Sequence, residues 1–266
     1  MGKELLGSLE LNRIYQMDCL EGMKLIPDKS IDMILCDLPY GTTACKWDTI
    51  IPFESLWVQY ERIIKDNGAI VLTASQPFTS KLVMSNIKYF KYEWIYQKNA
   101  GSNFGAVRFQ PMKEHENILV FGKGKINYFP IMQERADSGK ERSKYIVNLN
   151  TQTENYAKSL HNKIEYNMSE LRCPSSVQKF IIPKGKDKVA HPTQKPVKLF
   201  EYLIKTYTNE NEIVLDNCIG SGTTAVACTL NNRKWIGFET ETKYIELANK
   251  RLEQIQLQDD LNKYEN

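Results

Sequence analysis

Short apolar runs alternate along the chain with segments whose apolar residues recur at helical spacing. The runs predict strands at Ser30–Cys36, Gly68–Ala74, Tyr92–Gln97, Asn117–Phe121, Glu212–Leu215 and Lys234–Phe238. The amphipathic segments predict helices at Phe53–Ile64, Pro77–Ile87, Val197–Tyr207, Thr223–Leu230 and Thr242–Leu257. Because strands that alternate with helices form βαβ units, the pattern predicts an α/β fold with a doubly wound, mostly parallel sheet.

The alternation stops between residues 122 and 190, where the chain becomes polar and rich in Asn. A structureless loop of that length is uncommon inside a compact domain, so we expect an insert. Residues 121–190 contain 13 Lys+Arg against 7 Asp+Glu, whereas the whole chain has a net charge of only +3. Such a local excess of positive charge suits phosphate binding, although a solvated lysine-rich surface is the alternative.

Length and composition predict a compact globular protein. A chain of 266 residues with 42% hydrophobic content can bury a substantial core. It shows neither an apolar run of transmembrane length nor a cleavable leader, so we expect a cytoplasmic protein with no membrane partner. The six cysteines lack Cys-x-x-Cys spacing, and we therefore predict neither a disulfide framework nor a metal site.

The first candidate for chemistry follows the strand at Ser30–Cys36. Asp37 would emerge at the carboxyl end of that strand, where ligands of open α/β sheets bind. Pro39 keeps Leu38 extended, and Tyr40 adds an aromatic face. A carboxylate, a constrained carbonyl and a ring together suit the grip of an exocyclic amino group and the stacking of its heterocycle. An ordinary strand-end turn is the alternative.

A second candidate follows the strand at Glu212–Leu215. Asp216 ends that strand, and Gly220 and Gly222 precede a helix that begins near Thr223. Glycines at such a turn let the backbone approach a nucleoside ligand, and Glu239, after the next strand, is placed to hold ribose hydroxyls. The spacing leaves a dinucleotide cofactor open, but the absence of a lysine argues against a phosphate-binding P-loop.

Three motifs together resemble a known family. The sequence DLPY at 37–40 resembles a D-P-P-Y catalytic motif, DNCIGSGTT at 216–224 resembles a cofactor loop, and HPTQKP at 191–196 resembles the motif that precedes that loop. In this order they are typical of the β-class S-adenosylmethionine-dependent DNA amino-methyltransferases. The resemblance covers nearly the whole chain and implies a Rossmann-like methyltransferase sheet. It also implies a catalytic half at 1–121, a target-recognition insert at 122–190 and a cofactor-binding half at 191–266.

The resemblance implies methyl transfer from S-adenosylmethionine to the N6 amino group of a flipped adenine in double-stranded DNA. Asp37 and the carbonyl of Leu38 or Pro39 would accept hydrogen bonds from that amino group, and Tyr40 would stack on the base. An initial Asp in the motif favours adenine, with N4 of cytosine as the alternative. A non-catalytic nucleic-acid-binding protein of the same fold is the alternative from another class.

The resemblance also assigns further residues. Asp18 would contact the adenine ring of the cofactor or simply cap a helix. His191, Thr193 and Lys195 would hold the methionine end of the cofactor. The basic segment contributes Lys184, Lys186 and Lys188 as phosphate contacts, with solvated charge as the alternative. A homodimer and a partner restriction endonuclease both remain open.

Two departures from the family pattern affect the pocket. Leu38 replaces the usual proline, but Pro39 still constrains it. The segment Asn217-Cys218-Ile219 lacks the usual aromatic residue, whose space Cys218 or Ile219 would fill. We expect Trp47, soon after the catalytic motif, to pack against the following helix, with a DNA contact as the alternative.

Overall fold

The computed structural model describes residues 3–43, 45, 47–137, 170–183, 185 and 194–264, with only the backbone beyond residue 257. The chain divides into two compact units. The larger unit comprises Met1–Phe129 and Ser176–Asn266, and the smaller unit comprises Pro130–Ser175. In the part of the chain that is described, no helix is both long and apolar enough to cross a membrane.

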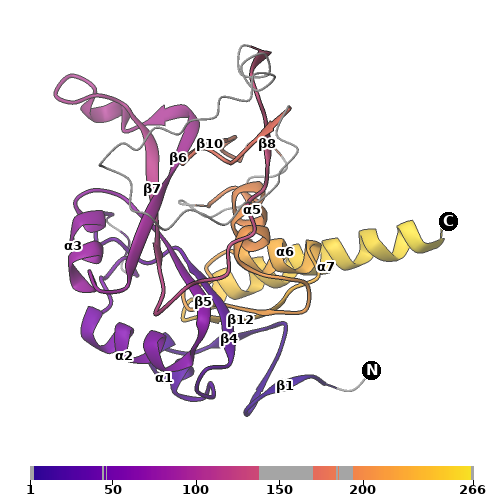
Figure 1. The fold of residues 1–266 in the computed structure, drawn as a ribbon. Helices are drawn as coiled ribbons and strands as arrows, with labels where there is room; N and C mark the ends of the chain where they lie inside the picture. The colour runs from indigo at the N-terminus through magenta and orange to yellow at the C-terminus, as the bar shows by residue number, and fades with distance from the viewer. Residues whose placement is uncertain are drawn as a thin grey trace, which may run out of the picture. The chain divides into compact units, whose positions relative to one another are not determined.

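An eight-stranded sheet in the order β10-β6-β7-β5-β4-β11-β12-β3 forms the centre of the larger unit (Figure 1). Its strands are β3 (Arg13–Gln16), β4 (Ile31–Cys36), β5 (Ile64–Ala74), β6 (Phe90–Ser102), β7 (Lys113–Phe121), β10 (Val177–Phe180), β11 (Ile213–Asp216) and β12 (Lys234–Glu239). Strand β7 pairs antiparallel with β5 and β6, and the other pairings of this sheet are parallel. The predicted α/β fold with a mostly parallel sheet is confirmed.

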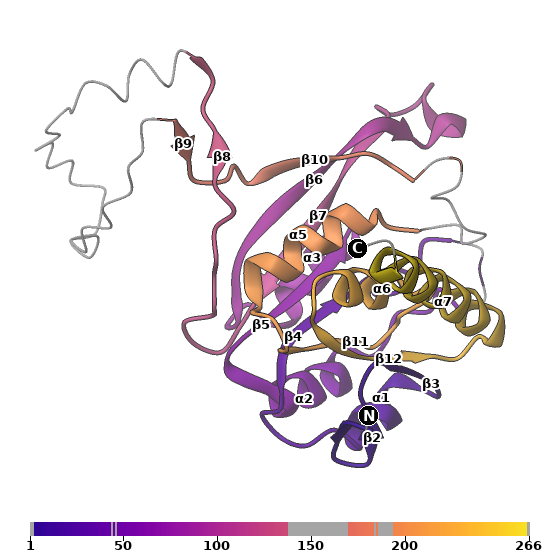
Figure 2. The same cartoon turned by 90° about the vertical axis from the view of Figure 1, so that its right-hand side faces the viewer.

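Helices cover both faces of the sheet. They are α1 (Cys19–Lys24), α2 (Phe53–Ile63), α3 (Phe78–Ser85), α5 (Val197–Tyr207), α6 (Thr223–Leu230) and α7 (Thr242–Tyr264). Ile34 and Cys36 of β4 belong to the core with α1, α2 and α3, whereas Met33 and Leu35 belong to the core with α5, α6 and α7. Figure 2 shows the latter three helices grouped together. Because side chains alternate across a strand, β4 contributes to both cores, and all six of its residues are buried.

Two edge strands escaped the sequence analysis. Strands β3 and β10 have four residues each, and most of those residues are at least partly exposed. So short a half-exposed segment gives no clear apolar run. Strand β10 lies within the segment 122–190 that we expected to be an insert, yet it extends the main sheet beside β6.

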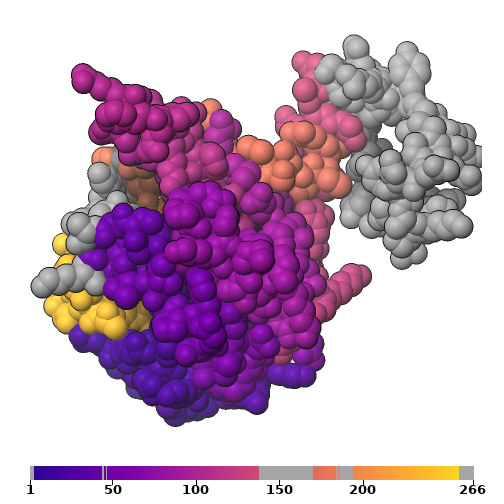
Figure 3. Space-filling view, turned by 90° about the vertical axis from the view of Figure 1, so that its left-hand side faces the viewer, coloured from indigo at the N-terminus to yellow at the C-terminus, as the bar shows by residue number. Residues whose placement is uncertain are grey.

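Several short elements complete the described chain. Strands β1 (Leu5–Leu6) and β2 (Leu9–Glu10) pair with each other, as do β8 (Gln133–Glu134) and β9 (Leu171–Arg172) in the smaller unit. The connection between β6 and β7 contains the 3-10 helix η1 (Phe104–Ala106). Its tip protrudes in the space-filling view (Figure 3) and exposes Phe104 and Phe109.

A buried carboxylate joins two neighbouring strands at their beginning. Asp32 of β4 is 7% exposed, and its side chain accepts a 2.9 Å hydrogen bond from Ile213 N at the start of β11. Its other oxygen lies 2.6 Å from Lys65 Nζ. We expect Asp32→Ala to lower the free energy of unfolding by about 1–3 kcal/mol, because a partly buried N–H loses its partner. Urea denaturation measures this change.

A matched control is Asp28→Ala, since the Asp28 side chain is 73% exposed and pairs with Arg62 at the surface. Exposed ion pairs contribute little, so this variant should lose less than about 1 kcal/mol. Equal losses in the two variants would contradict the role given to Asp32.

Candidate active site

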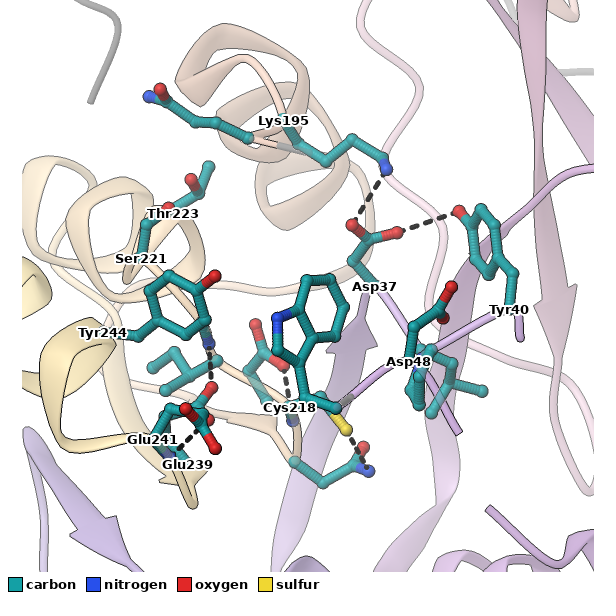
Figure 4. Close-up of a pocket in the computed structure, with 18 of the residues that line it drawn as sticks. Asp37, Tyr40, Asp48, Lys195, Cys218, Ser221, Thr223, Glu239, Glu241 and Tyr244 are labelled. Atoms are coloured by element: carbon teal, nitrogen blue, oxygen red, sulfur yellow. Dashed lines mark hydrogen bonds and ion pairs between the residues drawn. The ribbon is translucent and has the colours of Figure 1, made fainter. Parts of the chain in front are cut away.

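Three neighbouring parallel strands each end in an acidic residue at the same edge of the sheet. Asp37 follows β4, Asp216 ends β11 and Glu239 ends β12. All three line one cavity of about 790 Å³, a size typical of pockets for small organic ligands (Figure 4). Gly220 lines the same cavity, so the two motifs meet as the sequence predicted.

The Asp37 carboxylate is held from three sides. Its Oδ1 accepts a 2.8 Å hydrogen bond from the hydroxyl of Tyr40 and a further short one from the hydroxyl of Thr73. Its Oδ2 lies 2.8 Å from Lys195 Nζ. The Tyr40 ring in turn stacks on Phe78, with ring centroids 5.1 Å apart. These contacts fix the orientation of the carboxylate at the edge of the cavity.

The rest of the DLPY motif lies between the core and the cavity. Leu38 is 4% exposed and belongs to the core with α1, α2 and α3, while Pro39 lines the cavity. Burial and the nearby Asp37 carboxylate raise the pKa of Tyr40 well above its usual value of 10.0. The Tyr40 phenol therefore remains a hydrogen-bond donor at neutral pH.

The loop after the motif brings an unexpected aromatic residue to the cavity. Asp48 accepts hydrogen bonds of 2.6–2.9 Å from the backbone N–H groups of Gly41, Thr42 and Thr43, which closes the loop. The adjacent Trp47 lines the cavity and meets the Tyr244 ring edge-on, with centroids 6.2 Å apart. We expect Trp47 to pack against the following helix, and the structure places it at the wall of the cavity as well.

The turn between β11 and α6, which contains Gly220 and Gly222, is called the glycine turn here. Asp216 holds this turn in shape from its buried side. Its Oδ1 accepts a 3.1 Å hydrogen bond from Cys218 N, and its Oδ2 accepts one from the Thr224 hydroxyl. Burial raises the pKa of Asp216 to about 7, although these hydrogen bonds partly oppose the shift. Asp216 is 3% exposed, so it shapes the turn more than it offers itself to a ligand.

The glycine turn is tied to the end of β12. Glu239 Oε2 accepts a 2.9 Å hydrogen bond from Gly220 N, and its Oε1 accepts bonds from Thr240 N and Glu241 N. Gly222 has a φ of +79°, and a Cβ there would lie 2.6 Å from the Cβ of Ala248. Only glycine suits that position, where helix α7 approaches the turn. An ionised carboxylate has about four acceptor sites, so Glu239 retains acceptor capacity for a ligand's hydroxyls.

Ile219, one of the residues where the sequence departs from the family pattern, packs against the sheet. Ile219 is 4% exposed, and a Cβ on Gly237 of β12 would lie 2.2 Å from its Cδ1. Gly237 therefore makes room for Ile219 against the sheet. Cys218 and Ile219 both line the cavity.

The cysteines at the cavity are not thiolates. All six cysteines are free, and Cys19 and Cys218 line the cavity. A hydrogen bond with Cys218 and burial raise the pKa of Cys19 far above its usual value, and burial raises that of Cys36 to about 12. The pKa of Cys218 is raised as well. Methylation at a ring carbon needs a thiolate nucleophile, and the described part of this cavity offers none at neutral pH.

The remaining predicted site residues fall into two groups. Asp18 caps α1 by accepting hydrogen bonds from Leu20 N and Glu21 N, and it also lines the cavity, as does Thr223. Lys195 lines the cavity too, where it pairs with Asp37. Five residues lie outside the described part of the chain: Lys184, Lys186, Lys188, His191 and Thr193.

Sequence reasoning missed several side chains at the cavity. Glu116 and Lys98 line it from β7 and β6, and Tyr244 lines it from α7. Glu116 directly precedes the strand that we predicted at Asn117–Phe121. Its charge gave no signal, because a charged residue beside a strand is usually at the surface.

Comparison with known proteins identifies the family. The N6_N4_Mtase family model, described as DNA methylase, matches residues 31–250. The chain belongs to this family of DNA amino-methyltransferases. It is 30% identical to the type II methyltransferase M.HinfI of Haemophilus influenzae over 92% of this chain and 69% of that protein. It is 28% identical to M.HpaI of Haemophilus parainfluenzae over 91% of this chain and 74% of that protein.

Solved structures share the fold of this methyltransferase. The complex of M1.HpyAVI with SAM has 26% identity and a TM-score of 0.62, and the match covers 90% of this chain and 98% of that one. The cytosine-N4-specific PvuII DNA methyltransferase has 16% identity and a TM-score of 0.61, over 90% and 85% of the two chains. At such low identity the second likeness concerns the fold alone.

The raised pKa of Asp216 predicts how the free energy of unfolding changes with pH. The folded chain holds this proton up to about pH 7, whereas the unfolded chain releases it near the usual pKa of 3.8. The stabilising contribution of protonated Asp216 is therefore complete below pH 3.8 and is lost as the pH rises through 7. Asp216→Asn does not titrate, so its free energy of unfolding should gain about 1–3 kcal/mol relative to wild type between pH 5 and pH 8. Urea denaturation across this range tests the prediction, and a constant difference would contradict it.

Proposed function

We propose that this methyltransferase transfers a methyl group from S-adenosylmethionine to the N6 amino group of adenine in double-stranded DNA. One observation carries the proposal: Asp37 and the glycine turn at Gly220 line a single cavity. An acceptor for an amino group and a turn suited to a nucleoside cofactor then face the same space.

The residues present fit the cofactor. Glu239 offers acceptor sites at the end of β12, and the backbone at Gly220 and Gly222 carries no side chain that would fill the turn. Asp18 and Thr223 line the same cavity. M1.HpyAVI, which shares this fold, was solved with SAM. When bound, S-adenosylmethionine supplies an electrophilic methyl group on a positively charged sulfur.

The catalytic motif acts by positioning and electrostatics. An aromatic amino group is a weak nucleophile because its lone pair is delocalised into the ring. Asp37 and the carbonyl of Leu38 or Pro39 accept hydrogen bonds from that amino group, which localises the lone pair on nitrogen. Stacking on an aromatic ring such as that of Tyr40 stabilises an extruded base by roughly 1–3 kcal/mol, which offsets much of the cost of flipping.

Adenine is the proposed base because the motif begins with Asp37 instead of Ser. The alternative is the N4 amino group of cytosine, which an acceptor at Asp37 suits equally well. The likeness to the cytosine-N4-specific PvuII enzyme supports the fold alone and favours neither base.

The proposal also covers the contacts with DNA and the partner proteins. Lys184, Lys186 and Lys188 contact phosphates, within a segment whose positive charge suits DNA. The relatives include enzymes named type II methyltransferases and one named an orphan methyltransferase. The proposed role is therefore modification of specific sites, with a partner restriction endonuclease and a homodimer as further possibilities.

Asp37→Ala tests the proposed chemistry. Incubation of wild type with methyl-labelled cofactor and DNA, followed by digestion to nucleosides and mass spectrometry, should yield N6-methyladenine. The variant should still bind the cofactor in calorimetry, yet transfer methyl groups about 100-fold more slowly or worse, because it lacks the acceptor. Transfer at a near-normal rate would refute the role of Asp37, and N4-methylcytosine would refute the choice of base.

The triple substitution of Lys184, Lys186 and Lys188 to Gln tests the DNA contacts. Each lysine that neutralises a phosphate adds about 0.9 to the slope of log affinity against log salt. The variant should bind all DNA sequences more weakly and show a correspondingly shallower slope in fluorescence anisotropy. An unchanged slope would show that these lysines do not touch the backbone.

A further inference from the structure

At the catalytic end of the cavity, four charged side chains form a continuous chain of ion pairs. Lys195 Nζ lies 2.8 Å from Asp37 Oδ2 and 3.1 Å from Glu116 Oε2. The other oxygen of Glu116 lies 2.5 Å from Lys98 Nζ. Two ammonium groups thus meet two carboxylates, and their formal charges sum to zero. Figure 4 shows Lys195 reaching Asp37 from the side opposite Glu239.

This ion chain is withdrawn from solvent. The side chains of Lys195, Glu116 and Asp37 are 8%, 12% and 22% exposed. Removal of charges from water costs energy, which their mutual attraction offsets only when each charge has its partner. Loss of any one member therefore leaves a net charge beside the cavity.

Both central members stay charged at neutral pH. Although burial alone would raise it, the ammonium groups of Lys195 and Lys98 lower the pKa of Glu116 to about 2. Burial opposes the charge of Lys195, but the carboxylates of Asp37 and Glu116 raise its pKa well above 10.5. The balance of charge is thus a fixed property of the folded protein.

We infer that Lys195 is a positioning residue that orients the Asp37 carboxylate, and that Glu116 cancels the charge of Lys195 so that the cavity accepts a cationic cofactor. The inference rests on the proposed function, and it gives Lys195 a different role from the cofactor contact that the sequence motif implied. Without Glu116, the ammonium of Lys195 would oppose a second positive charge in the same cavity.

The inference can be tested by comparing the affinities of the protein for two ligands that differ by one charge. S-adenosylmethionine carries a positive sulfur, whereas S-adenosylhomocysteine lacks the methyl group and has a neutral sulfur. Glu116→Gln leaves a surplus positive charge, and Lys195→Met leaves a surplus negative charge. The two variants should therefore shift the relative affinity for these ligands in opposite directions.

Isothermal titration calorimetry at neutral pH would give both dissociation constants for each variant. Relative to wild type, Glu116→Gln should disfavour S-adenosylmethionine over S-adenosylhomocysteine by about fivefold or more, the effect of one poorly screened charge. Lys195→Met should shift the ratio the other way, and the double variant should restore it. Lys205→Met is the matched control, because Lys205 is an exposed lysine on α5, and its ratio should equal that of wild type.

A common shift in both single variants, or an unchanged ratio in Glu116→Gln, would overturn the inference. A merely structural role for these residues predicts weaker binding of both ligands and no change in their ratio. Glu116→Gln preserves the size of the side chain, so it decides the question even where Lys195→Met fails to fold.

Rates of methyl transfer separate this inference from the proposed function. If wild type methylates DNA, Lys195→Met should lower kcat at least about tenfold while the KM for DNA changes little, because a misoriented Asp37 affects the reaction more than docking. An unchanged kcat would refute the positioning role alone. Absence of methylation by wild type would refute the proposed function, whatever the ligand ratios show.

Discussion

The parallel pairing of β4, β11 and β12 is the constraint on which the site depends. Leu215 pairs with Ile34 on one side and with Ile236 on the other. These strands are buried on both faces, so a slip of one residue would exchange the residues that face the two helical layers. The register therefore fixes where each strand ends. As a consequence, three carboxylates reach the same edge of the sheet, those of Asp37, Asp216 and Glu239. The packing of the core therefore determines the geometry of the cavity.

The same chemical group performs three tasks at this edge, and its surroundings decide which. Asp216 is sealed beneath the glycine turn, where burial raises its pKa and its oxygens organise the loop. Glu239 accepts three backbone N–H groups and joins the turn to β12. Asp37 instead meets side chains, namely those of Tyr40, Thr73 and Lys195. Asp216 and Glu239 hold the turn by accepting backbone N–H groups, and Glu239 keeps acceptor capacity for a ligand, whereas Asp37 is oriented by side chains at the surface of the cavity.

Sequence reasoning was strongest where local pattern and chemistry coincide. Apolar runs gave the central strands, and the residues just after them gave Asp37, Asp216 and Glu239. Sequence reasoning failed for strands and side chains whose positions depend on contacts with distant parts of the chain. Strand β10 is too short and exposed to show a pattern, yet it pairs along β6. Glu116 and Lys195 are far apart in sequence, and nothing local in either segment signals that they meet. Trp47 reaches the cavity because Asp48 closes its loop, a contact that no periodicity encodes.

A carboxylate beside an electrophilic methyl group can itself be methylated, because it is a nucleophile. In the proposed reaction Asp37 must accept a hydrogen bond from the amino group without competing for the methyl group. Its hydrogen bonds from Tyr40 and Thr73 and its ion pair with Lys195 occupy lone pairs that would otherwise compete. The donor on Oδ2 is a cation, and its charge calls for an anion nearby if the site is also to hold a sulfonium. The ion pair between Lys195 and Glu116 meets both demands in one buried arrangement.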